Sequence, residues 1–580
     1  MSKAKSPAVI AAEAAQAKLD VCLAAGSNFR LEAGAGAGKT YSLVAALKKI
    51  ISEKGPALMR AGQQVACITY TEVARKEIAS DIEEHPAILV NTIHGFGWAF
   101  ISRFQKSLLE LVASTADEKR QKTIDDAGGI CDQRVEYGLG FFGIDEKRIT
   151  LHHDDIPAFL SKMLASPKLQ RIFTSLYPVL FIDEYQDTDP LVMAALSEHF
   201  FAPKSGPLTG LFGDHWQTIY RKDYELASFP HVEGIDKGSN FRSVQTIVDV
   251  LNRLRPELKQ EVDCPEAKGE ARFFHCNSFK GERVDSRNGK QELPVAVHAQ
   301  AIEQVQQQLR DDGWAFQPAE TKILMLTHNA IAADRGYPTL ASIYDQKDNL
   351  VKKEDAAIAF LVDTILPIRE AYSAGKYGEM FALMGGIPTI RKMADKAKWR
   401  GDLDRLMELC ERGSIGQIID HLKETRRPRL PDRLVSREDD IARLGPAKTE
   451  DEPSSLKRYR LLRDASFSEI TALADFINGF TPFATQHSVK GAEFDDVLVV
   501  LSSGWNHYNW PKFFELLTTQ KITSKDEAGY HRVRNLFYVA ISRPKKRLAV
   551  LATQTLSDAA IAAAEKLFGV DNVVELQFGG

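Results

Sequence analysis

The sequence predicts an α/β protein in which helices cover parallel sheets, and three observations support this class. Short apolar segments recur along the chain and are separated by stretches with helical periodicity. A glycine-rich segment comes directly after one apolar segment, and a pair of carboxylates comes directly after another. The segments expected to form strands are 29–32, 65–71, 179–183, 208–213, 323–327, 497–502 and 548–552.

The N-terminal region predicts a helix and no targeting segment. Residues 1–19 are rich in alanine with scattered charges, and they lack the unbroken apolar core of a signal peptide. No apolar run in the chain approaches the ~20 residues of a membrane span. The six cysteines are scattered without a Cys-x-x-Cys pair, so we expect reduced thiols in the cytosol and neither a zinc site nor a disulfide framework.

The glycine-rich segment has the form of a phosphate-binding loop. A predicted strand at 29–32 leads into it, and a helix expected over 39–54, ending at Gly55, leads out. Glycines let backbone N–H groups close round an anion, and the helix N-terminus adds a partial positive charge. Lys39 would reach the β and γ phosphates, and Thr40 would bind Mg²⁺. The loop consists of Ala33, Gly34, Ala35, Gly36, Ala37, Gly38, Lys39 and Thr40, with Ala33 where glycine is usual.

The carboxylate pair, Asp183 and Glu184, ends the apolar strand 179–183. An open α/β sheet binds its ligand at this carboxyl end of the strands. One carboxylate can hold Mg²⁺, and the other can orient an attacking water. A bare Asp-Glu pair is more often two solvated acids in a turn, but the phosphate loop upstream favours a nucleotide-hydrolysing site.

Two long insertions are predicted in this α/β chain. Lys39 and Asp183 lie much farther apart than a minimal sheet core requires, and the polar region 102–170 between them is the first candidate. The second is 330–480, which lacks convincing strands and has helical periodicity over 356–368 and 467–477. Its charged, proline-punctuated middle, 424–453, predicts a loop or linker.

Composition places few restrictions on the partners of the protein. The chain has 580 residues, of which 44% are hydrophobic and 26% charged, and its net charge is −4. The chain as a whole has no net positive charge that would indicate binding to nucleic acid, so any strand-binding groove must be local. His152 and His153, followed by two aspartates, could suggest a metal site, but adjacent side chains on regular structure point apart, so we expect a polar loop.

Further motifs follow the predicted strands in a fixed order. They are Ile-Thr-Tyr-Thr-Glu-Val-Ala at 68–74, Asn-Thr-Ile-His-Gly-Phe at 91–96, Gly-Asp-His-Trp-Gln-Thr-Ile-Tyr at 213–220, Asn-Phe-Arg-Ser at 240–243, Gln-His-Ser-Val-Lys-Gly-Ala-Glu-Phe at 486–494 and Leu-Phe-Tyr-Val-Ala-Ile-Ser-Arg at 536–543. With the phosphate loop and the Asp-Glu strand, this order resembles the UvrD/PcrA/Rep group of superfamily 1 DNA helicases over nearly the whole chain.

The resemblance implies two RecA-like P-loop NTPase cores, each with an inserted, mainly helical accessory domain. ATP would bind between the cores. The expected division is 1–100 (core 1, first part), 101–170 (insertion), 171–236 (core 1, second part), 237–330 (core 2, first part), 331–481 (insertion) and 482–580 (core 2, second part).

The resemblance also assigns roles at the nucleotide. Asp183 and Thr40 would bind Mg²⁺, and Glu184 would activate water. Gln217 would sense the γ-phosphate, and Arg242 and Arg543 of the second core would be arginine fingers, since a guanidinium fork can stabilise charge spread over the γ-oxygens. Three more residues would contact the nucleoside: Gln16 and Phe241 at the adenine and Glu493 at the ribose.

Seven residues occupy strand-contacting positions by resemblance, and small donors with aromatics suit such a channel. They are Tyr70, Thr71, Thr92, His94, Tyr220, His487 and Ser488. Phe96 and Trp98 are expected in the core, whereas Trp216 and Tyr220 could each stack on a base or fill an interdomain seam. The family commonly has a stacking Trp shortly after the tyrosine, and Lys222 stands there.

The implied function is an ATP-dependent translocase on single-stranded DNA and a 3′-to-5′ helicase, of use in DNA repair or antiviral defence. The alternative is a DNA-stimulated regulatory ATPase that licenses or loads a partner and unwinds little. Residues 544–580 after the last motif are too few for a nuclease domain, so we expect a partner protein, such as the nuclease of the two-gene helicase–nuclease defence systems that this architecture resembles.

Overall fold

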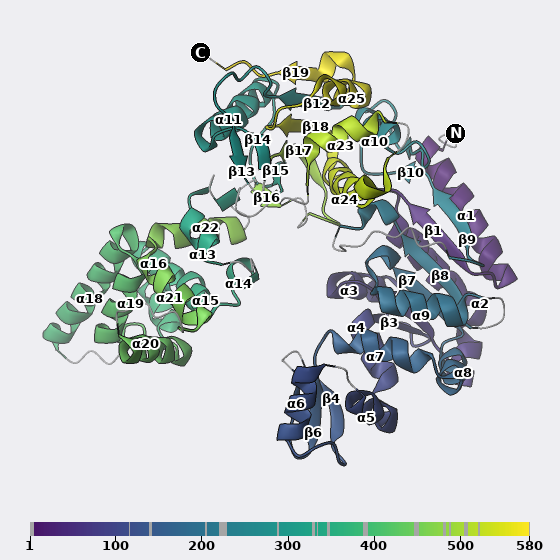
Figure 1. The fold of residues 1–580 in the computed structure, drawn as a ribbon, viewed down its shortest axis with the longest axis horizontal. Helices are drawn as coiled ribbons and strands as arrows, with labels where there is room; N and C mark the ends of the chain where they lie inside the picture. The colour runs from purple at the N-terminus through teal and green to yellow at the C-terminus, as the bar shows by residue number, and fades with distance from the viewer. Residues whose placement is uncertain are drawn as a thin grey trace. The chain divides into compact units, whose positions relative to one another are not determined.

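The computed structural model describes residues 5–114, 117–138, 142–202, 206–219, 229–286, 289–326, 331–332, 335–344, 348–386, 392–445, 452–478, 483–485, 489–503, 508–519 and 522–578. The chain divides into two compact units, and Figure 1 labels the helices and strands of both. The first unit is Met1–Ala271, Leu516–Arg547 and Ala563–Val570, and the second is Arg272–Glu515, Leu548–Ala562 and Asp571–Gly580. The six predicted segments and their boundaries remain predictions.

A parallel six-stranded sheet forms the centre of the first unit, in the order β3-β2-β7-β8-β1-β9. The apolar runs of β2 and β7 are buried along their whole length, as expected for central strands covered on both faces. The strands are β1 (Phe29–Ala33), β2 (Val65–Thr69), β3 (Ile88–Thr92), β7 (Val179–Asp183), β8 (Leu208–Gly213) and β9 (Glu233–Lys237).

The first unit also contains helices and a separate two-stranded sheet, β10-β11. The helices are α1 (Pro7–Ala25), α2 (Lys39–Ala61), α3 (Glu72–Asp81), α9 (Pro190–Phe200), α10 (Gln245–Leu254) and α24 (Ser524–Ile541), with β10 (Ser239–Asn240) paired to β11 (Glu261–Val262). The helix predicted to end at Gly55 instead continues through Pro56 to Gly62, whose left-handed backbone caps it. Leu58 is buried in the core, and this packing offsets the hydrogen bond that proline removes.

The first insertion is mainly helical, as predicted, and also contains three short strands. Its elements are α5 (Gln105–Ala113), α6 (Glu118–Asp126), α7 (Asp155–Leu164), β4 (Arg134–Tyr137), β5 (Gly143–Ile144) and β6 (Arg148–Leu151). The helix α4 (Ile93–Ile101) leads into it, and α8 (Pro167–Leu176) leads out of it. The three strands form a small sheet in the order β4-β6-β5. Val135, Ile149 and Leu151 are fully buried, so alternate residues of short strands supply the core.

A second six-stranded sheet, in the order β16-β15-β17-β18-β12-β19, forms the centre of the second unit. Its strands are β12 (Glu270–His275), β15 (Thr321–Met325), β16 (Phe483–Thr485), β17 (Phe494–Leu501), β18 (Pro544–Ala552) and β19 (Val573–Glu575), and β15 runs parallel to both β16 and β17. The helix α11 (Val295–Asp311) contributes to its core. Two parallel sheets with long insertions confirm the predicted fold class.

The second insertion is helical and has a core of its own. Its helices are α13 (Pro338–Ile343), α14 (Asp348–Val351), α15 (Ala356–Phe360), α16 (Leu366–Ser373), α17 (Tyr377–Leu383), α18 (Met393–Arg412), α19 (Ile415–Thr425), α20 (Asp432–Leu444), α21 (Ser454–Asp464) and α22 (Phe467–Ile477), with a π-helical turn at Leu361–Ile365.

The linker predicted over 424–453 is wrong where α20 forms. Leu434 on this helix is fully buried, and the buried carboxylate of Glu438 accepts hydrogen bonds from Tyr459 and Arg463. Charge made the segment look solvated, but partners from α21 satisfy it.

No helix among the described residues is long and apolar enough to cross a membrane. All six cysteines are free in the structure.

Candidate active site

The phosphate loop joins β1 to α2 in the first unit, and close packing explains its glycines. Gly36 and Gly38 have φ values of 75° and 72°, which favour glycine. A Cβ on Gly34 would lie 2.6 Å from the side chain of Gln260, and one on Gly36 would lie 2.8 Å from that of Arg242. Ala33 is the last residue of β1 and is extended, so alanine in the usual glycine position causes no strain.

Polar side chains from outside the loop hold its backbone. The carbonyl of Ala35 accepts hydrogen bonds from Gln260 at 3.0 Å and Asn240 at 3.1 Å. The N–H of Ala35 donates to the hydroxyl of Tyr538 at 3.1 Å. Buried backbone groups need such partners. The loop shape therefore depends on three side chains far from it in sequence.

Lys39, Asp183 and Glu184 meet at the carboxyl ends of the strands, as predicted. The Lys39 ammonium lies 3.5 Å from Asp183 and forms an ion pair with Glu184. Burial would lower the pKa of Lys39, but the two carboxylates raise it above its usual range. Burial raises the pKa of Asp183, although Lys39 opposes this shift.

The oxygen atoms at this site are suitable ligands for a hard divalent cation. The Oδ1 atom of Asp183 is buried and accepts no hydrogen bond, although it lies 3.5 Å from the Lys39 ammonium, and the residue is 4% exposed. Thr40 lies on the first turn of α2, next to Lys39. A carboxylate and a hydroxyl are ligands that Mg²⁺ accepts in sites completed by phosphate oxygens. Asp183 and Thr40 thus remain the residues we expect to hold Mg²⁺.

Glu184 and Gln217 come from neighbouring strands and share one polar network. Glu184 has a left-handed backbone, with φ of 48°, that turns the chain at the end of β7. Gln186 donates to Glu184 and accepts from the N–H of Asp214 at 3.1 Å. Gln217 donates to Asp214 at 2.9 Å. The predicted water-activating and sensing residues are thus linked through Gln186 and Asp214.

Arg242 and Arg543 lie close together in the first unit, which also holds the phosphate loop. Arg242 donates to the carbonyl of Ser542 at 3.0 Å. Arg543 is 1% exposed and donates to Val539 and Ser542. Burial lowers the pKa of the Arg543 guanidinium, and the nearby Arg242 lowers it further. Two adjacent cations favour an anionic ligand with several oxygens.

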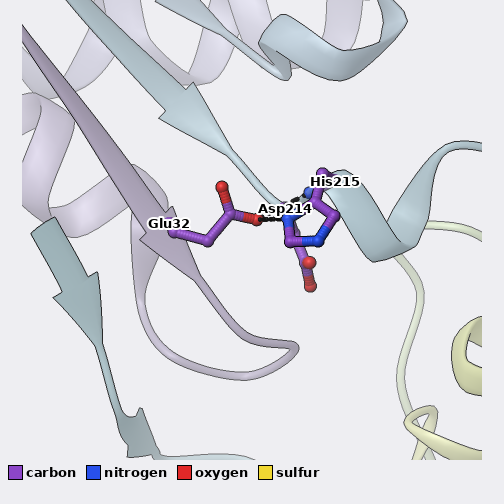
Figure 2. A group of neighbouring side chains, drawn as sticks. All are labelled: Glu32, Asp214 and His215. Carbon is purple, nitrogen blue, oxygen red and sulfur yellow. Dashed lines mark hydrogen bonds and ion pairs between the residues drawn. The ribbon is translucent and has the colours of Figure 1, made fainter. Parts of the chain in front are cut away.

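A buried ion network lies beside this site (Figure 2). Glu32, Asp214 and His215 present ligand atoms within 4.8 Å of one another, in an arrangement that could suggest a metal. Arg255 fills this role instead, at 2.6 Å from Asp214 and 3.4 Å from Glu32. Burial would raise the pKa of Glu32, but His215 and Arg255 bring it to about 2. The cluster is therefore a stable ion network with its own cation.

Trp216, in the 3₁₀ turn η2 (His215–Gln217), belongs to the packed interior. It is 5% exposed and lies between the guanidinium groups of Arg255 and Arg534, at 5.0 Å and 3.8 Å from its ring. Tyr538 packs edge-on at 5.5 Å. Of the two alternatives left open for Trp216, base stacking is therefore not available in this arrangement, and Trp216 fills the interior.

Four residues predicted to contact a nucleic-acid strand lie at one edge of the first sheet. β2 and β3 end side by side, with Thr69 opposite Thr92, so Tyr70, Thr71, Thr92 and His94 follow the same edge. The hydroxyls of Thr71 and Thr92 cap α3 and α4. The structure thus brings these four together, whereas Tyr220, His487 and Ser488 lie outside the described residues.

His94 has an additional partner from the first insertion. Its ring stacks on that of His153 at 3.5 Å, and the Tyr137 hydroxyl lies 2.6 Å from His153 Nδ1. Burial and His153 lower the pKa of His94 to about 4. His153 therefore lies in a loop, as predicted, but it packs on a core motif. Phe96 is buried as expected, and Trp98 packs against the same core.

The three residues predicted to contact the nucleoside lie in different surroundings. Gln16 on α1 donates to Asp20, and its Oε1 is buried without a donor, as an adenine-reading amide would require. Phe241 is 45% exposed beside the phosphate loop. Glu493 is exposed and precedes β17 in the second unit. All three roles remain predictions.

Several residues of this site were missed by sequence reasoning. Glu32 is a charged residue in the predicted strand 29–32, and this was the available signal, whereas Lys237 ends a charged strand that the sequence analysis did not predict. Arg255, Gln260 and Tyr538 had none, because their partners are distant in sequence.

Comparisons with known proteins agree with this geometry. Residues 20–223 match the AAA domain, and residues 439–555 match the UvrD-like helicase C-terminal domain. The chain is 23% identical to the Gabija protein GajB of Bacillus cereus (strain HuB5-5), over 90% of this chain and 93% of that protein. It is 27% identical to the RecBCD enzyme subunit RecB of Chlamydia pneumoniae, over 20% of this chain and 12% of that protein.

The chain belongs to the UvrD-like superfamily 1 helicases. This confirms the family that the ordered motifs indicated. The residues matched by the AAA domain include the phosphate loop, Asp183, Glu184 and Gln217.

Replacing Glu184 by Gln in this UvrD-like helicase should leave Mg-ATP binding intact and slow hydrolysis by at least ~10²-fold, because the water loses its base. Lys39→Ala should weaken nucleotide binding as well. Single-turnover ATP hydrolysis and ADP titration, both with single-stranded DNA present, measure these effects. Near-normal turnover in both variants would contradict the assignment.

Arg242→Ala and Arg543→Ala should each lower kcat by ~10³–10⁵-fold, as loss of an arginine finger does. Steady-state kinetics over a range of ATP concentrations separates kcat from KM. Arg253→Ala is the control, since this α10 arginine donates to the carbonyl of Leu567 away from the site. An effect confined to KM would make the mutated arginine a binding residue.

Proposed function

We propose that this UvrD-like helicase is an ATP-driven translocase on single-stranded DNA that separates duplex strands with 3′-to-5′ polarity. The observation that carries the proposal is the convergence, within one compact unit, of the phosphate loop, two carboxylates, a glutamine and two arginines. These groups supply every function that phosphoryl transfer to water requires from a protein.

The hydrolytic step follows from the positions of the charges. Glu184 would take a proton from the water whose oxygen forms the new bond to the γ-phosphorus, while the bond to the β–γ bridging oxygen breaks. Lys39 would exchange its pairing with Glu184 for phosphate oxygens and so leave that carboxylate available. Arg242 and Arg543 would stabilise the charge on the γ-oxygens. Mg²⁺ held by Asp183 and Thr40 would neutralise charge on the β and γ oxygens.

Coupling to DNA would run through the loop that follows β8. Gln217 lies in this loop and hydrogen-bonds to Asp214. Asn535 on α24 donates to the carbonyls of His215 and Thr218 at 3.4 Å and 3.1 Å, so α24 holds the same turn. Tyr220 follows shortly afterwards in the sequence. A change at the γ-phosphate sensed by Gln217 would thereby reach a predicted DNA contact.

The DNA track itself is supported by the clustering of Tyr70, Thr71, Thr92 and His94 at one sheet edge. An exposed aromatic, hydroxyls and an imidazole suit a strand that is held by stacking and by phosphate contacts. ATP binding and hydrolysis would alternately tighten and release the grip on the strand. The polarity rests on the family resemblance alone.

A regulatory ATPase that loads or licenses a partner is the second candidate. It is favoured by the acidic balance of the chain and by Lys222 in the position of the family's stacking Trp. The similarity to the Gabija protein GajB over nearly the whole of both chains is compatible with either candidate. The two differ in whether the isolated chain releases an annealed strand.

We expect ATPase activity to rise steeply with single-stranded DNA and much less with blunt duplex, and a labelled oligonucleotide to be displaced from a 3′-tailed duplex. Affinity for DNA should fall with salt, since phosphate contacts release counterions. Tyr220→Ala should abolish most of the stimulation, at a cost of ~1–3 kcal/mol if the ring stacks on a base. Tyr377→Ala, on an exposed side chain of α17, is the control. Hydrolysis without displacement would favour the regulatory ATPase.

For the second candidate, we expect a stable partner protein, with a nuclease as the specific proposal. Co-purification with the product of an adjacent gene, followed by displacement assays with and without it, measures the dependence. The insertions 102–170 and 330–480 are the proposed docking surfaces, because neither contains a residue of the nucleotide site, and the second has a hydrophobic core of its own. Processive unwinding by the isolated chain, with no partner recovered, would contradict it.

A further inference from the structure

We propose that Lys237 is a second ammonium group of the phosphate site, which holds the phosphate loop from behind and strengthens the binding of nucleotides through their phosphates. The inference rests on the proposed function only in taking residues 33–40 as a nucleotide site. It adds a positioning residue that the family's ordered motifs do not include.

The position of Lys237 is fixed by the first sheet. Lys237 is the last residue of β9 and pairs with Ala33, the first residue of the loop. Its side chain is buried, with 1% exposure. The ammonium donates to the carbonyl of Gly38 at 2.7 Å and to the hydroxyl of Ser42 at 2.8 Å. Both acceptors belong to the turn that begins α2, so Lys237 joins the sheet to the N-terminus of the phosphate-binding helix.

This is an unfavourable place for a positive charge by itself. Both acceptors are neutral, and the N-terminus of a helix carries a partial positive charge that disfavours a cation. Burial lowers the pKa of Lys237 to about 8. A buried charge of this kind is stabilised by an opposite charge nearby.

The acidic groups on the surrounding elements are engaged elsewhere or exposed. Glu233 and Asp236, on β9 itself, are exposed. Other described acids on neighbouring elements pair with cations: Glu32 of β1 with His215 and Arg255, Asp183 and Glu184 after β7 with Lys39, and Glu13 and Asp20 of α1 with Lys5 and Lys49. Glu53 of α2 is exposed. The other charged side chains at the phosphate loop include Lys39 and Arg242. Both are cations, so neither can neutralise the charge of Lys237.

A nucleotide would supply the missing negative charge. A Cβ built on Gly38 would lie 3.6 Å from the Lys237 ammonium and 3.7 Å from the ring of Phe241. The amine and the predicted adenine-stacking ring therefore flank the same glycine. The N–H groups of this turn form the anion-binding face of the loop. A charge directly behind them acts on the phosphates over a short, largely desolvated path.

The test compares Lys237→Met, which removes the charge and both donors, with Lys237→Arg, which keeps the charge. Binding of ADP and of adenosine is measured by titration calorimetry at low salt, between pH 7 and 9. We expect Lys237→Met to weaken ADP binding by about tenfold or more, the equivalent of one pKa unit of coupling. Adenosine, which lacks phosphates, should bind within about twofold of wild type.

The pH dependence has a definite sign. Lys237 is charged below its pKa and neutral above it, and the charged form binds phosphate better. Wild-type affinity for ADP should therefore be greatest near pH 7 and fall, by up to about tenfold per pH unit, above pH 8. Lys237→Arg should lack this decrease, because arginine stays charged.

A purely structural role predicts a different pattern. Equal weakening of ADP and adenosine by Lys237→Met, or ADP affinity unchanged by it, would overturn the proposal. If Lys237→Met does not fold, the comparison of wild type with Lys237→Arg decides, and a flat wild-type profile between pH 7 and 9 overturns it. Loss of ADP binding in Lys39→Ala with no effect in Lys237→Met would leave the proposed function intact and refute this inference alone.

Discussion

The buried ion pair between Arg255 and Asp214, at 2.6 Å, fixes the part of the molecule on which the nucleotide site depends. Both side chains are almost fully buried, at 2% and 1% exposure. Asp214 also accepts hydrogen bonds from the side chain of Gln217 and from the N–H of Trp216, so one carboxylate orients the turn after β8. Loss of either partner of such a pair leaves an uncompensated buried charge, which costs about 3–5 kcal/mol.

The same network connects the strand before the phosphate loop to α24. Arg255 also contacts Glu32, which is the second-last residue of β1, and it lies 5.5 Å from the ring of Tyr538. The hydroxyl of Tyr538 accepts from the N–H of Ala35 in the loop. The loop, the turn with Gln217 and the helix with Arg543 therefore share one set of buried polar contacts. Such shared contacts allow a change at one of these elements to affect the others.

Charge balance explains why the site suits a polyanion. Two cations beyond Lys39 lie close to each other, Arg242 and Arg543, and burial lowers the pKa of Arg543. Lys237 adds a third behind the loop. Asp183 and Glu184, which pair with Lys39, supply two negative charges near the four cations Lys39, Lys237, Arg242 and Arg543. A triphosphate is the kind of ligand that compensates the excess of positive charge.

The α/β class, the phosphate loop and the Asp-Glu strand could all be predicted from the amino-acid sequence. These features are local: a strand, a turn and a helix follow one another within a short segment, and their composition reports burial and turn geometry directly. The same reasoning failed at Gly55 and at 424–453, where packing of Leu58 and pairing of Glu438 outweighed local propensity. Tertiary structure alone decided that Trp216 lies between two arginines and that Arg255, Gln260 and Tyr538 reach the phosphate site. Contacts between residues hundreds of positions apart leave no periodic trace in a single sequence, because they depend on which elements the fold brings together.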